Sequence, residues 1–462
     1  MKKIHLNIED IFNIPTAVIY NPDMFKSIYH VSINSRNIKK NSLFIAIKGE
    51  RFDGHDFINE VVKRGASAIV INEKKFKKIN DLEIPVITVK DTTLALGEIA
   101  KLWRAKLKTK IIGITGSAGK TTTKEILAAL LSEKFKVNKT VANNNNHIGV
   151  PLTILSTNEK HQVLVAELGT NHFGEIPYSA VIASPDLALI TNIGDSHLEY
   201  LKNRNGVFKE KSALFNETLK RTGKVFINND DKILKEFGKT VKGKVTFALK
   251  EKADYKAIIK GYDKFAKPQI EIGNKKKSFA ATLPLSGEKN VLNFTAAFAI
   301  ASELGLTNSQ IQKAVKKIKS YNKRLEIKNY KTFTLIDDTY NANPDSMKSA
   351  LEILDKIESR KKKIAVLGDM FELGREAKLK HIALASFINK TNVDEVYSIG
   401  KMMKLMNQKL NEKIKVQKHF ADREMLKRFL KSLDINNSAI LIKGSRGMKM
   451  EEFVSIIEST KY

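Results

Sequence analysis

Residues 111–131 constrain the possible folds of this chain more than any other stretch. The apolar run 111–115 is typical of a buried β-strand, Gly116 and Gly119 bracket a turn, and residues 124–131 have the spacing of a helix. A strand, a glycine-rich turn and a helix in this order form a phosphate cradle, because the N–H groups of the turn and the helix N-terminus point at one anion. The sequence therefore predicts a phosphate-binding loop at one edge of a β-sheet.

The side chains that follow the turn fit a nucleotide site. Lys120 supplies a mobile cation for the phosphates, and Thr121 supplies a hydroxyl for the magnesium ion that accompanies a nucleotide. The strict Walker spacing requires a glycine at position 114, where this chain has Ile114, so the match is to the shorter pattern Gly-x-x-Gly-Lys-Thr. An ordinary glycine turn between a strand and a helix is the alternative.

Length and composition limit the class of protein. A chain of 462 residues predicts about three domains. The sequence has no cysteine, which excludes a disulfide scaffold, a thiolate metal site and thiol catalysis. We find neither a signal-peptide core near the N-terminus nor an apolar run of membrane-spanning length, so we expect a cytoplasmic protein without membrane insertion.

The formal net charge of +30 has two readings. A basic protein of this kind could bind nucleic acid, or it could combine a lysine-rich composition with an anionic substrate. The lysines are spread over the whole length, and no aromatic stripe accompanies them as a single-strand binding surface requires. We therefore favour the second reading and expect no nucleic-acid partner, although the charge should speed association with polyanionic ligands.

The alternation of apolar runs with helical segments predicts an α/β fold of three domains. Residues 1–90 form a small α/β module without a phosphate loop, and a helix is expected there at 57–64. Residues 91–322 contain a connecting helix near 94–107, the phosphate loop and a parallel sheet, as in an ATPase domain. Residues 323–462 contain four strand–helix units, which are typical of a Rossmann-like, doubly wound sheet.

Polar residues directly after the central strands are candidate ligand contacts, since ligands of parallel sheets lie at the carboxyl ends of the strands. They include Glu167, whose carboxylate could hold magnesium or a bound water, and His197. Taken singly, Glu167 could equally be a surface carboxylate and His197 a solvated loop residue. Lys211, in a helical stretch, could be an ordinary solvent-facing lysine.

Together, the motifs resemble those of the ATP-dependent Mur ligases of peptidoglycan synthesis, in the same order and over nearly the whole chain. They are the stretches 34–36, 43–49 and 53–55, then 115–122, 143–151, 167–169 and 192–197, and finally 337–344, 367–374 and 443–446. The turn 337–344 discriminates best, because the branch of the family that adds a dipeptide carries it. The branch that adds the third stem-peptide residue has a different sequence there.

The resemblance implies an ATP site completed by the third domain. Its cofactor-binding residues would be Thr115, Gly116, Ser117, Ala118, Gly119, Lys120, Thr121, Thr122, Asn293, Arg324 and Asp338. Two magnesium ions would be held by Thr121, Glu167, His197 and Lys211, the last as a carbamylated lysine that acts like a carboxylate. The catalytic residues would be Lys120, Glu167, His197, Lys211, Arg324 and Asp338.

The resemblance also implies two substrates, UDP-N-acetylmuramoyl-tripeptide and D-alanyl-D-alanine, which are joined through an acyl phosphate at the expense of ATP. The UDP-sugar would lie against the first domain and the dipeptide against the third. The substrate-binding residues would be Ser35, Arg36, Lys48, Asp53, His55, Asn143, Asn145, Asn146, Tyr340, Asn341, Asn343, Ser346, Lys443 and Ser445. A monomer is the simplest expectation.

Three positions depart from the usual pattern of the family, and three alternative functions stay open. Asn34 stands where aspartate is more frequent, Ala213 where glutamate is frequent, and Lys289 where histidine is usual. The alternatives are a sister ligase that adds the third stem residue, a basic nucleic-acid-binding ATPase, and a homologue that binds UDP-sugars without catalysis.

Overall fold

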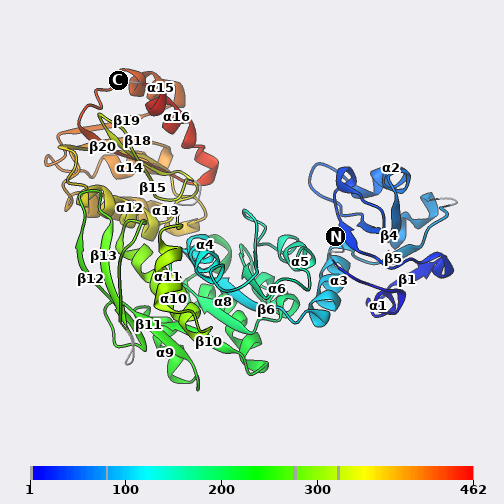
Figure 1. Ribbon diagram of the computed structural model, residues 1–462. Helices are drawn as coiled ribbons and strands as arrows, with labels where there is room; N and C mark the ends of the chain where they lie inside the picture. Colours follow the sequence, from blue (N-terminus) through cyan, green and yellow to red (C-terminus); the bar gives the residue numbers. More distant parts are fainter. Residues whose placement is uncertain (1–3, 80–81, 274–277, 320–322, 461–462) are drawn as a thin grey trace.

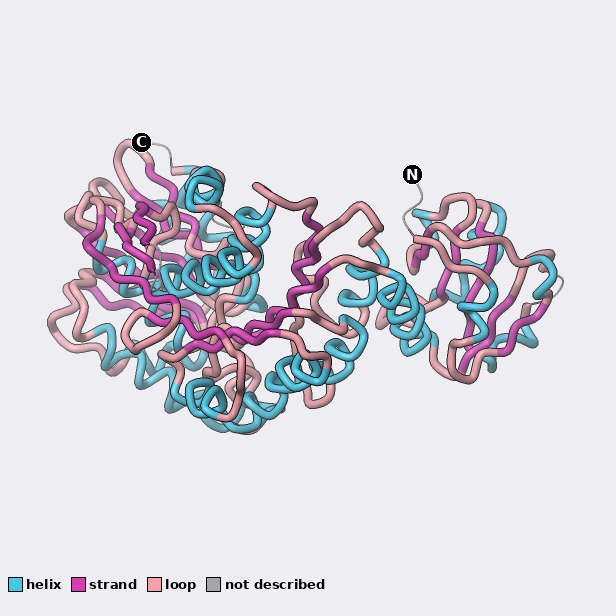
Figure 2. The backbone as a smooth tube through the Cα atoms, turned by 60° about the horizontal axis from the view of Figure 1, so that its bottom comes forward, coloured by secondary structure: helices cyan, strands magenta, loops and turns pink. Residues whose placement is uncertain are grey.

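Three α/β domains follow one another along the chain (Figure 1). The computed structural model describes residues 4–79, 82–273, 278–319 and 323–460. In two views, the first domain stands apart at one end, and the third domain lies against the far side of the central domain (Figures 1 and 2). The α/β class with three domains, expected from the sequence, is confirmed. No helix in the described part of the chain is long and apolar enough to cross a membrane.

The first domain is built on a five-stranded sheet. Its strands occur in the order β1 (Val18–Tyr20), β5 (Val86–Val89), β4 (Ala66–Asn72), β3 (Ser42–Ile45) and β2 (His30–Ser32). Only the pair of β1 and β5 is antiparallel. The helices are α1 (Ile8–Phe12) and α2 (Ile58–Lys63), and a 3-10 turn at 54–57 precedes α2, so the helix expected at 57–64 is confirmed to within a residue at each end.

Helix α3 (Thr92–Lys106) joins the first domain to the central one. Asp91 caps the start of this helix, because its carboxylate accepts hydrogen bonds from the backbone N–H groups of Thr93 and Leu94. One apolar core runs from the first domain through the buried face of α3 into the central domain. The indole of Trp103 also donates a hydrogen bond of 2.8 Å to the Thr157 carbonyl. The helix is therefore anchored in the cores of both domains.

The central sheet has nine strands. Their order is β14 (Ser278–Thr282), β13 (Pro268–Gly273), β12 (Tyr255–Tyr262), β11 (Val245–Ala248), β10 (Lys224–Asn228), β9 (Leu187–Ile190), β6 (Lys110–Thr115), β8 (Val163–Glu167) and β7 (Val137–Lys139). The strands from β7 to β12 are parallel, and β12, β13 and β14 form an antiparallel meander. The sequence analysis did not predict this meander, because its short polar and apolar stretches lack the continuous apolar run of a central parallel strand.

Helices cover both faces of the central sheet. They are α4 (Lys120–Leu131), α5 (Gly149–Leu155), α6 (Glu175–Ala183), α7 (Leu198–Leu201), α8 (Arg204–Lys220), α9 (Lys232–Lys239), α10 (Glu288–Glu303) and α11 (Asn308–Val315). Alternate residues of β6 enter different cores, Ile111 on the side of α8 and Ile112 on the side of α4. Helix α4 begins at Lys120, four residues earlier than expected, so Lys120 and Thr121 lie in its first turn.

The third domain has a six-stranded sheet with helices on both faces. The strands occur in the order β15 (Glu326–Asn329), β16 (Thr334–Asp338), β20 (Ser438–Lys443), β17 (Lys362–Gly368), β18 (Glu395–Ile399) and β19 (Val416–Phe420). The helices are α12 (Pro344–Lys356), α13 (Ala377–Ile388), α14 (Lys401–Asn407), α15 (Arg423–Ser432) and α16 (Glu451–Ser459). The four predicted strands are confirmed, and the two edge strands β15 and β19 are additions that the sequence analysis did not predict. Only β15 is antiparallel to its neighbour.

Arg104 fixes the end of α3 to the central domain. Its buried guanidinium donates to the carbonyls of Ala183 at 3.1 Å and Ser184 at 3.0 Å, and to the Asp186 carboxylate at 3.0 Å. Further donors reach the carbonyls of residues 107 and 109 at 3.1 and 3.3 Å. One side chain therefore satisfies the polar groups where α3, α6 and β6 meet.

We predict that Arg104→Met lowers the free energy of unfolding by about 3 kcal/mol, because the variant leaves several carbonyls without donors and removes the guanidinium partner of the half-buried Asp186 carboxylate. Chemical denaturation followed by circular dichroism measures the change. Lys101→Met, on the exposed side of the same helix, is the control and should stay within about 0.5 kcal/mol of the unmodified protein. Equal stabilities of the two variants would contradict the anchoring role of Arg104.

Candidate active site

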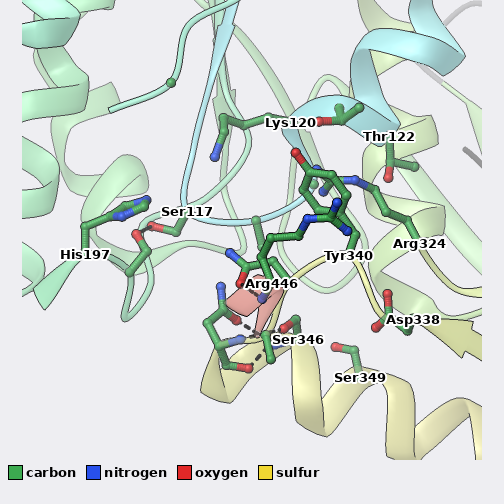
Figure 3. Close-up of a pocket in the computed structure, with 18 of the residues that line it drawn as sticks. Ser117, Lys120, Thr122, His197, Arg324, Asp338, Tyr340, Ser346, Ser349 and Arg446 are labelled. Carbon is green, nitrogen blue, oxygen red and sulfur yellow. Dashed lines mark hydrogen bonds between the residues drawn. The ribbon is translucent and has the colours of Figure 1, made fainter. Parts of the chain in front are cut away.

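A cleft of about 520 Å³ lies between the central and third domains (Figure 3). One wall is the phosphate loop together with the ends of β8 and β9, and the other wall is the turn after β16. Of the residues predicted for the site, those that line the cleft are Ser117, Ala118, Gly119, Lys120, Thr121, Thr122, Asn143, Asn145, Glu167, His197, Asn293, Arg324, Asp338, Tyr340, Asn341, Asn343, Ser346 and Lys443. The structure therefore brings most of the predicted ATP site into one cavity.

The backbone of the phosphate loop requires glycine at two positions. Gly116 and Gly119 have φ angles of +149° and +82°. A side chain at Gly119 would also collide with Asn293, because a Cβ there would lie 2.5 Å from the Asn293 Oδ1. The ammonium of Lys120 folds back onto the Gly116 carbonyl at 2.8 Å, and burial lowers the pKa of Lys120. The loop is thus preformed around its own lysine.

Glu167 presents a buried carboxylate to the same cavity. It is 1% exposed, and its Oε1 accepts hydrogen bonds from the Thr121 hydroxyl at 3.0 Å and the Asn145 amide at 2.9 Å. These partners come from the start of α4 and from the asparagine-rich loop 143–146. A hydroxyl beside a carboxylate next to a phosphate loop is a donor set that suits Mg²⁺ with a nucleotide.

His197 connects the central domain to the third domain. It has a left-handed backbone, with φ +53°, and its Nδ1 lies 2.7 Å from the Glu372 Oε2. Burial lowers the pKa of His197, while the adjacent histidine ring lowers the pKa of Glu372. Glu372 was not among the predicted site residues, although it lies in the acidic turn that follows β17.

Lys211 lies in α8 and does not line the cleft. It is 0% exposed, and its Nζ has no hydrogen-bond partner within the described residues. Burial, and after it the charge of Lys120, lowers the pKa of Lys211 well below its usual value. The solvent-facing alternative for Lys211 is therefore wrong, and a neutral, nucleophilic amine is favoured at this position.

Arg324 and Tyr340 face the phosphate loop from the third domain (Figure 3). The guanidinium of Arg324 lies 3.8 Å from the centre of the Tyr340 ring, a cation–π distance. Asp338 accepts a hydrogen bond of 3.1 Å from the Leu325 N–H and forms a buried ion pair with Lys443. Lys443 also donates a hydrogen bond of 2.9 Å to the Asn341 carbonyl, so it fixes the backbone of the turn after β16.

Four more of the predicted substrate residues also form hydrogen bonds within the protein. Asn343 caps α12, where its Oδ1 accepts from the Ser346 N–H at 2.8 Å, and the Ser346 hydroxyl accepts from the Asn343 N–H at 3.0 Å. The Asn146 Oδ1 accepts hydrogen bonds from the N–H groups of residues 148 and 149, where α5 begins. The Ser445 hydroxyl accepts a bond of 2.7 Å from the Phe371 N–H. Asn146 and Ser445 do not line the cleft, nor do Thr115 and Gly116, which lie at the start of the loop.

The predicted UDP-sugar residues Ser35, Arg36, Lys48, Asp53 and His55 all lie in the first domain and line no part of this cleft. Asp53 and His55 form a pair, with 2.5 Å between Oδ1 and Nδ1, and the His55 Nε2 accepts from the Asn72 N–H. Although burial opposes it, contact with His55 and Lys75 lowers the pKa of Asp53 to about 2. Asn34 accepts a hydrogen bond from the Arg36 N–H at 3.0 Å, so this departure still caps its turn.

Several contacts between the domains were not predicted from the sequence. Lys289, one of the departures, donates a hydrogen bond of 2.6 Å to the Asp345 carbonyl in the third domain. Lys380 forms an ion pair of 2.7 Å with Asp195. Each pair joins residues far apart in the chain, so no local pattern could reveal it.

Ala213, the remaining departure, packs against the core of the central domain.

The sequence and the structure were also compared with known proteins. The chain matches three family descriptions, "Mur ligase family, catalytic domain" over residues 27–104, "Mur ligase middle domain" over 114–301 and "Mur ligase, glutamate ligase domain" over 323–446. It is 33% identical to a UDP-N-acetylmuramoyl-tripeptide–D-alanyl-D-alanine ligase of Bacillus subtilis, over 99% of each chain. Its structure resembles MurF from Acinetobacter baumannii, with a TM-score of 0.89, 30% identity and coverage of 99% and 100% of the two chains. It also resembles MurF from Thermotoga maritima in complex with ADP, with a TM-score of 0.83, 28% identity and coverage of 93% and 97%.

We predict that Lys443→Met destabilises the third domain by about 3 kcal/mol, because breaking a buried ion pair leaves the Asp338 carboxylate without its partner. Denaturation curves of the purified variant measure this loss. Lys401→Met, an exposed lysine in the same domain, is the matched control and should have almost no effect. If Lys443→Met unfolds at the same denaturant concentration as the control, Lys443 has no structural role and is available to a substrate.

Proposed function

The chain belongs to the Mur ligase family and to its MurF type, and we propose that it joins D-alanyl-D-alanine to UDP-N-acetylmuramoyl-tripeptide with the conversion of ATP to ADP and phosphate. The observation that carries this proposal is a phosphate loop and a buried carboxylate on one wall of a cleft, with Arg324 on the opposite wall. Similarity to a ligase of this name over 99% of the chain supports it. The product would be UDP-N-acetylmuramoyl-pentapeptide, a peptidoglycan precursor.

We propose a division of labour among three domains with boundaries near residues 90 and 322. The first domain would bind the UDP-sugar through the residues predicted above, the central domain would bind ATP, and the third would bind the dipeptide and complete the ATP site. The first domain contributes no residue to the described cleft, so the substrate must reach across from it to the phosphate loop. Closure of the third domain against the central domain would complete the ATP site and exclude water from the reactive intermediate.

The reaction requires two steps, the first at the γ-phosphorus of ATP and the second at the carboxyl carbon of the tripeptide. An oxygen of the terminal carboxylate of the tripeptide attacks the γ-phosphorus, the bond from that phosphorus to the bridging oxygen breaks, and ADP leaves. The amine of the dipeptide then attacks the carbonyl carbon of the acyl phosphate, loses a proton, and phosphate departs. Lys120 and Arg324, which lie on opposite walls, would balance the negative charge on the transferred phosphoryl group.

Magnesium fits the residues on the central wall. The Thr121 hydroxyl and the Glu167 Oε1, which lie 3.0 Å apart, are hard oxygen donors of the kind that magnesium prefers. No group of three or more His, Asp or Glu side chains that could hold a metal occurs among the described residues, so nucleotide phosphates and a modified Lys211 would complete the ligands. We propose two ions, held by Thr121, Glu167, His197 and carbamylated Lys211. Bound magnesium would supply positive charge at the phosphoryl group.

We further propose that the enzyme acts in the cytoplasm as a monomer, because its proposed substrates, ATP and a UDP-linked precursor, are made there and both walls of the cleft come from one chain. Analytical ultracentrifugation tests this part of the proposal. A dimer at working concentration would overturn it.

Phosphate release from MgATP tests the function itself. We predict that release requires both the UDP-tripeptide and D-alanyl-D-alanine, that mass spectrometry finds the pentapeptide product, and that Lys120→Met lowers the rate at least about a hundredfold. Lys134→Met is the control, because it also removes one lysine charge but lies just beyond the C-terminal end of α4, at the opposite end from Lys120. Its rate should stay unchanged. Release with a single amino acid and a shorter UDP-precursor would instead identify a sister ligase, and no release with any precursor would leave a binding protein.

Lys211 gives a second test, because its neutral amine should react with carbon dioxide. We predict a carbamate signal in the nuclear magnetic resonance spectrum after incubation with isotopically labelled bicarbonate, and loss of that signal in Lys211→Arg. Since only the neutral amine reacts, the signal should grow as the pH rises through the lowered pKa of Lys211. An unchanged spectrum in Lys211→Arg would assign the carbamate to another lysine.

A further inference from the structure

Lys124 is a buried cation that the proposed chemistry does not use. It lies one turn after Lys120 on α4 and is 0% exposed, which is rare for a lysine. Because it follows Thr121 by three residues, the two side chains lie on the same face of the helix, and both reach the carboxylate of Glu167. Lys124 does not line the cleft. It therefore lies behind the proposed metal-binding carboxylate.

The Lys124 ammonium lies close to oxygen atoms of Thr140, Glu125 and Glu167. It donates a hydrogen bond of 2.8 Å to the Thr140 carbonyl, and it lies 3.2 Å from the Glu125 Oε1 and 3.5 Å from the Glu167 Oε2. Thr140 also accepts a hydrogen bond of 2.9 Å from the Glu167 N–H on its hydroxyl. Thr140 thus forms hydrogen bonds both with the Lys124 ammonium and with the backbone of Glu167. On the outer side, Glu125 forms a further ion pair with Lys139 of β7.

The two oxygens of Glu167 have different surroundings. Oε1 receives hydrogen bonds from Thr121 and Asn145, and both of these residues line the cleft. Oε2 accepts no hydrogen bond from the described residues, and it is the carboxylate oxygen that lies 3.5 Å from the Lys124 ammonium. The carboxylate is therefore oriented, with one oxygen toward the cleft and the other toward the buried cation.

We propose that Lys124 is a positioning residue for the metal site: its charge holds the Glu167 carboxylate so that Oε1 faces the nucleotide. The inference rests on the proposed role of Glu167 as a magnesium ligand. A buried carboxylate without a counter-charge is unstable and turns toward other donors. Removal of the positive charge of Lys124 would by itself strengthen the binding of a nearby metal cation, because it removes a repulsion. The proposal therefore requires that the loss of metal affinity from a misoriented Glu167 is larger than this gain.

Binding of Mn²⁺, a paramagnetic substitute for Mg²⁺, to the protein with ADP tests the inference without any ligase turnover. We expect Lys124→Met to weaken Mn²⁺ binding about tenfold, as loss of groups that orient metal ligands commonly does. Lys124→Gln, which retains a donor for the Thr140 carbonyl but no charge, should have the same effect and is the second variant if Lys124→Met does not fold. Lys317→Met, which removes an exposed lysine paired with Glu133, is the control and should leave Mn²⁺ affinity unchanged.

A double-mutant cycle separates orientation from general destabilisation. If Lys124 acts through Glu167, adding Lys124→Met to Glu167→Gln should change Mn²⁺ affinity by less than about twofold. Unchanged or tighter Mn²⁺ binding in Lys124→Met, or fully additive losses in the cycle, would overturn the inference even if the protein is an active ligase. Failure of the unmodified protein to bind Mn²⁺ with ADP would overturn the metal site itself and the role of Lys124 with it.

Discussion

The geometry of the cleft depends on the parallel pairing of β6 with β8 on one side and β9 on the other. In the register of these strands, Ile114 lies opposite Glu167 and Thr115 lies opposite Ile190. The three strands therefore end at the same level, where the phosphate loop, the buried carboxylate and the Thr191 turn begin. Gly116 is required at this point, because a Cβ there would lie 1.9 Å from the Thr191 Oγ1. A bulkier residue would separate the strands whose ends make the site.

Polar contacts form much of the boundary between the central and third domains at the cleft. The ion pair of Lys380 with Asp195, the contact of His197 with Glu372 and the bond from Lys289 to the Asp345 carbonyl all cross this boundary. Such contacts can be exchanged for water at low cost, unlike the continuous apolar core that joins α3 to both of its domains. The third domain is therefore joined to the central domain at the cleft mainly through polar contacts, and Ala266 of the central domain packs in the core of the third.

Three buried lysines around the cleft show how surroundings set the chemistry of one residue type. Lys443 is paired with a carboxylate, and Lys124 lies close to oxygen atoms of Thr140, Glu125 and Glu167, so both serve as fixed cations. Lys211 has no hydrogen-bond partner within the described residues, and burial together with the charge of Lys120 lowers its pKa. Desolvation without compensation makes a lysine a neutral nucleophile, whereas desolvation with compensation makes it a structural ion.

The sequence alone determined the three α/β domains and the phosphate loop, because each depends on local patterns: apolar runs, helical spacing and glycines that bracket a turn. Glu167 was a candidate at a strand end that only the family resemblance promoted, and the pairing of β6 with β8 places it beside the loop. The sequence also pointed, through resemblance, to Arg324 and Asp338 in the other wall. It could not assign Lys124 or Lys211 their burial, separate the capping roles of Asn343 and Ser346 from substrate contact, or reveal Glu372 and Lys380 at the domain boundary. Those features arise from contacts between residues far apart in the chain, and only the tertiary structure decides which charges lose water and which partners replace it.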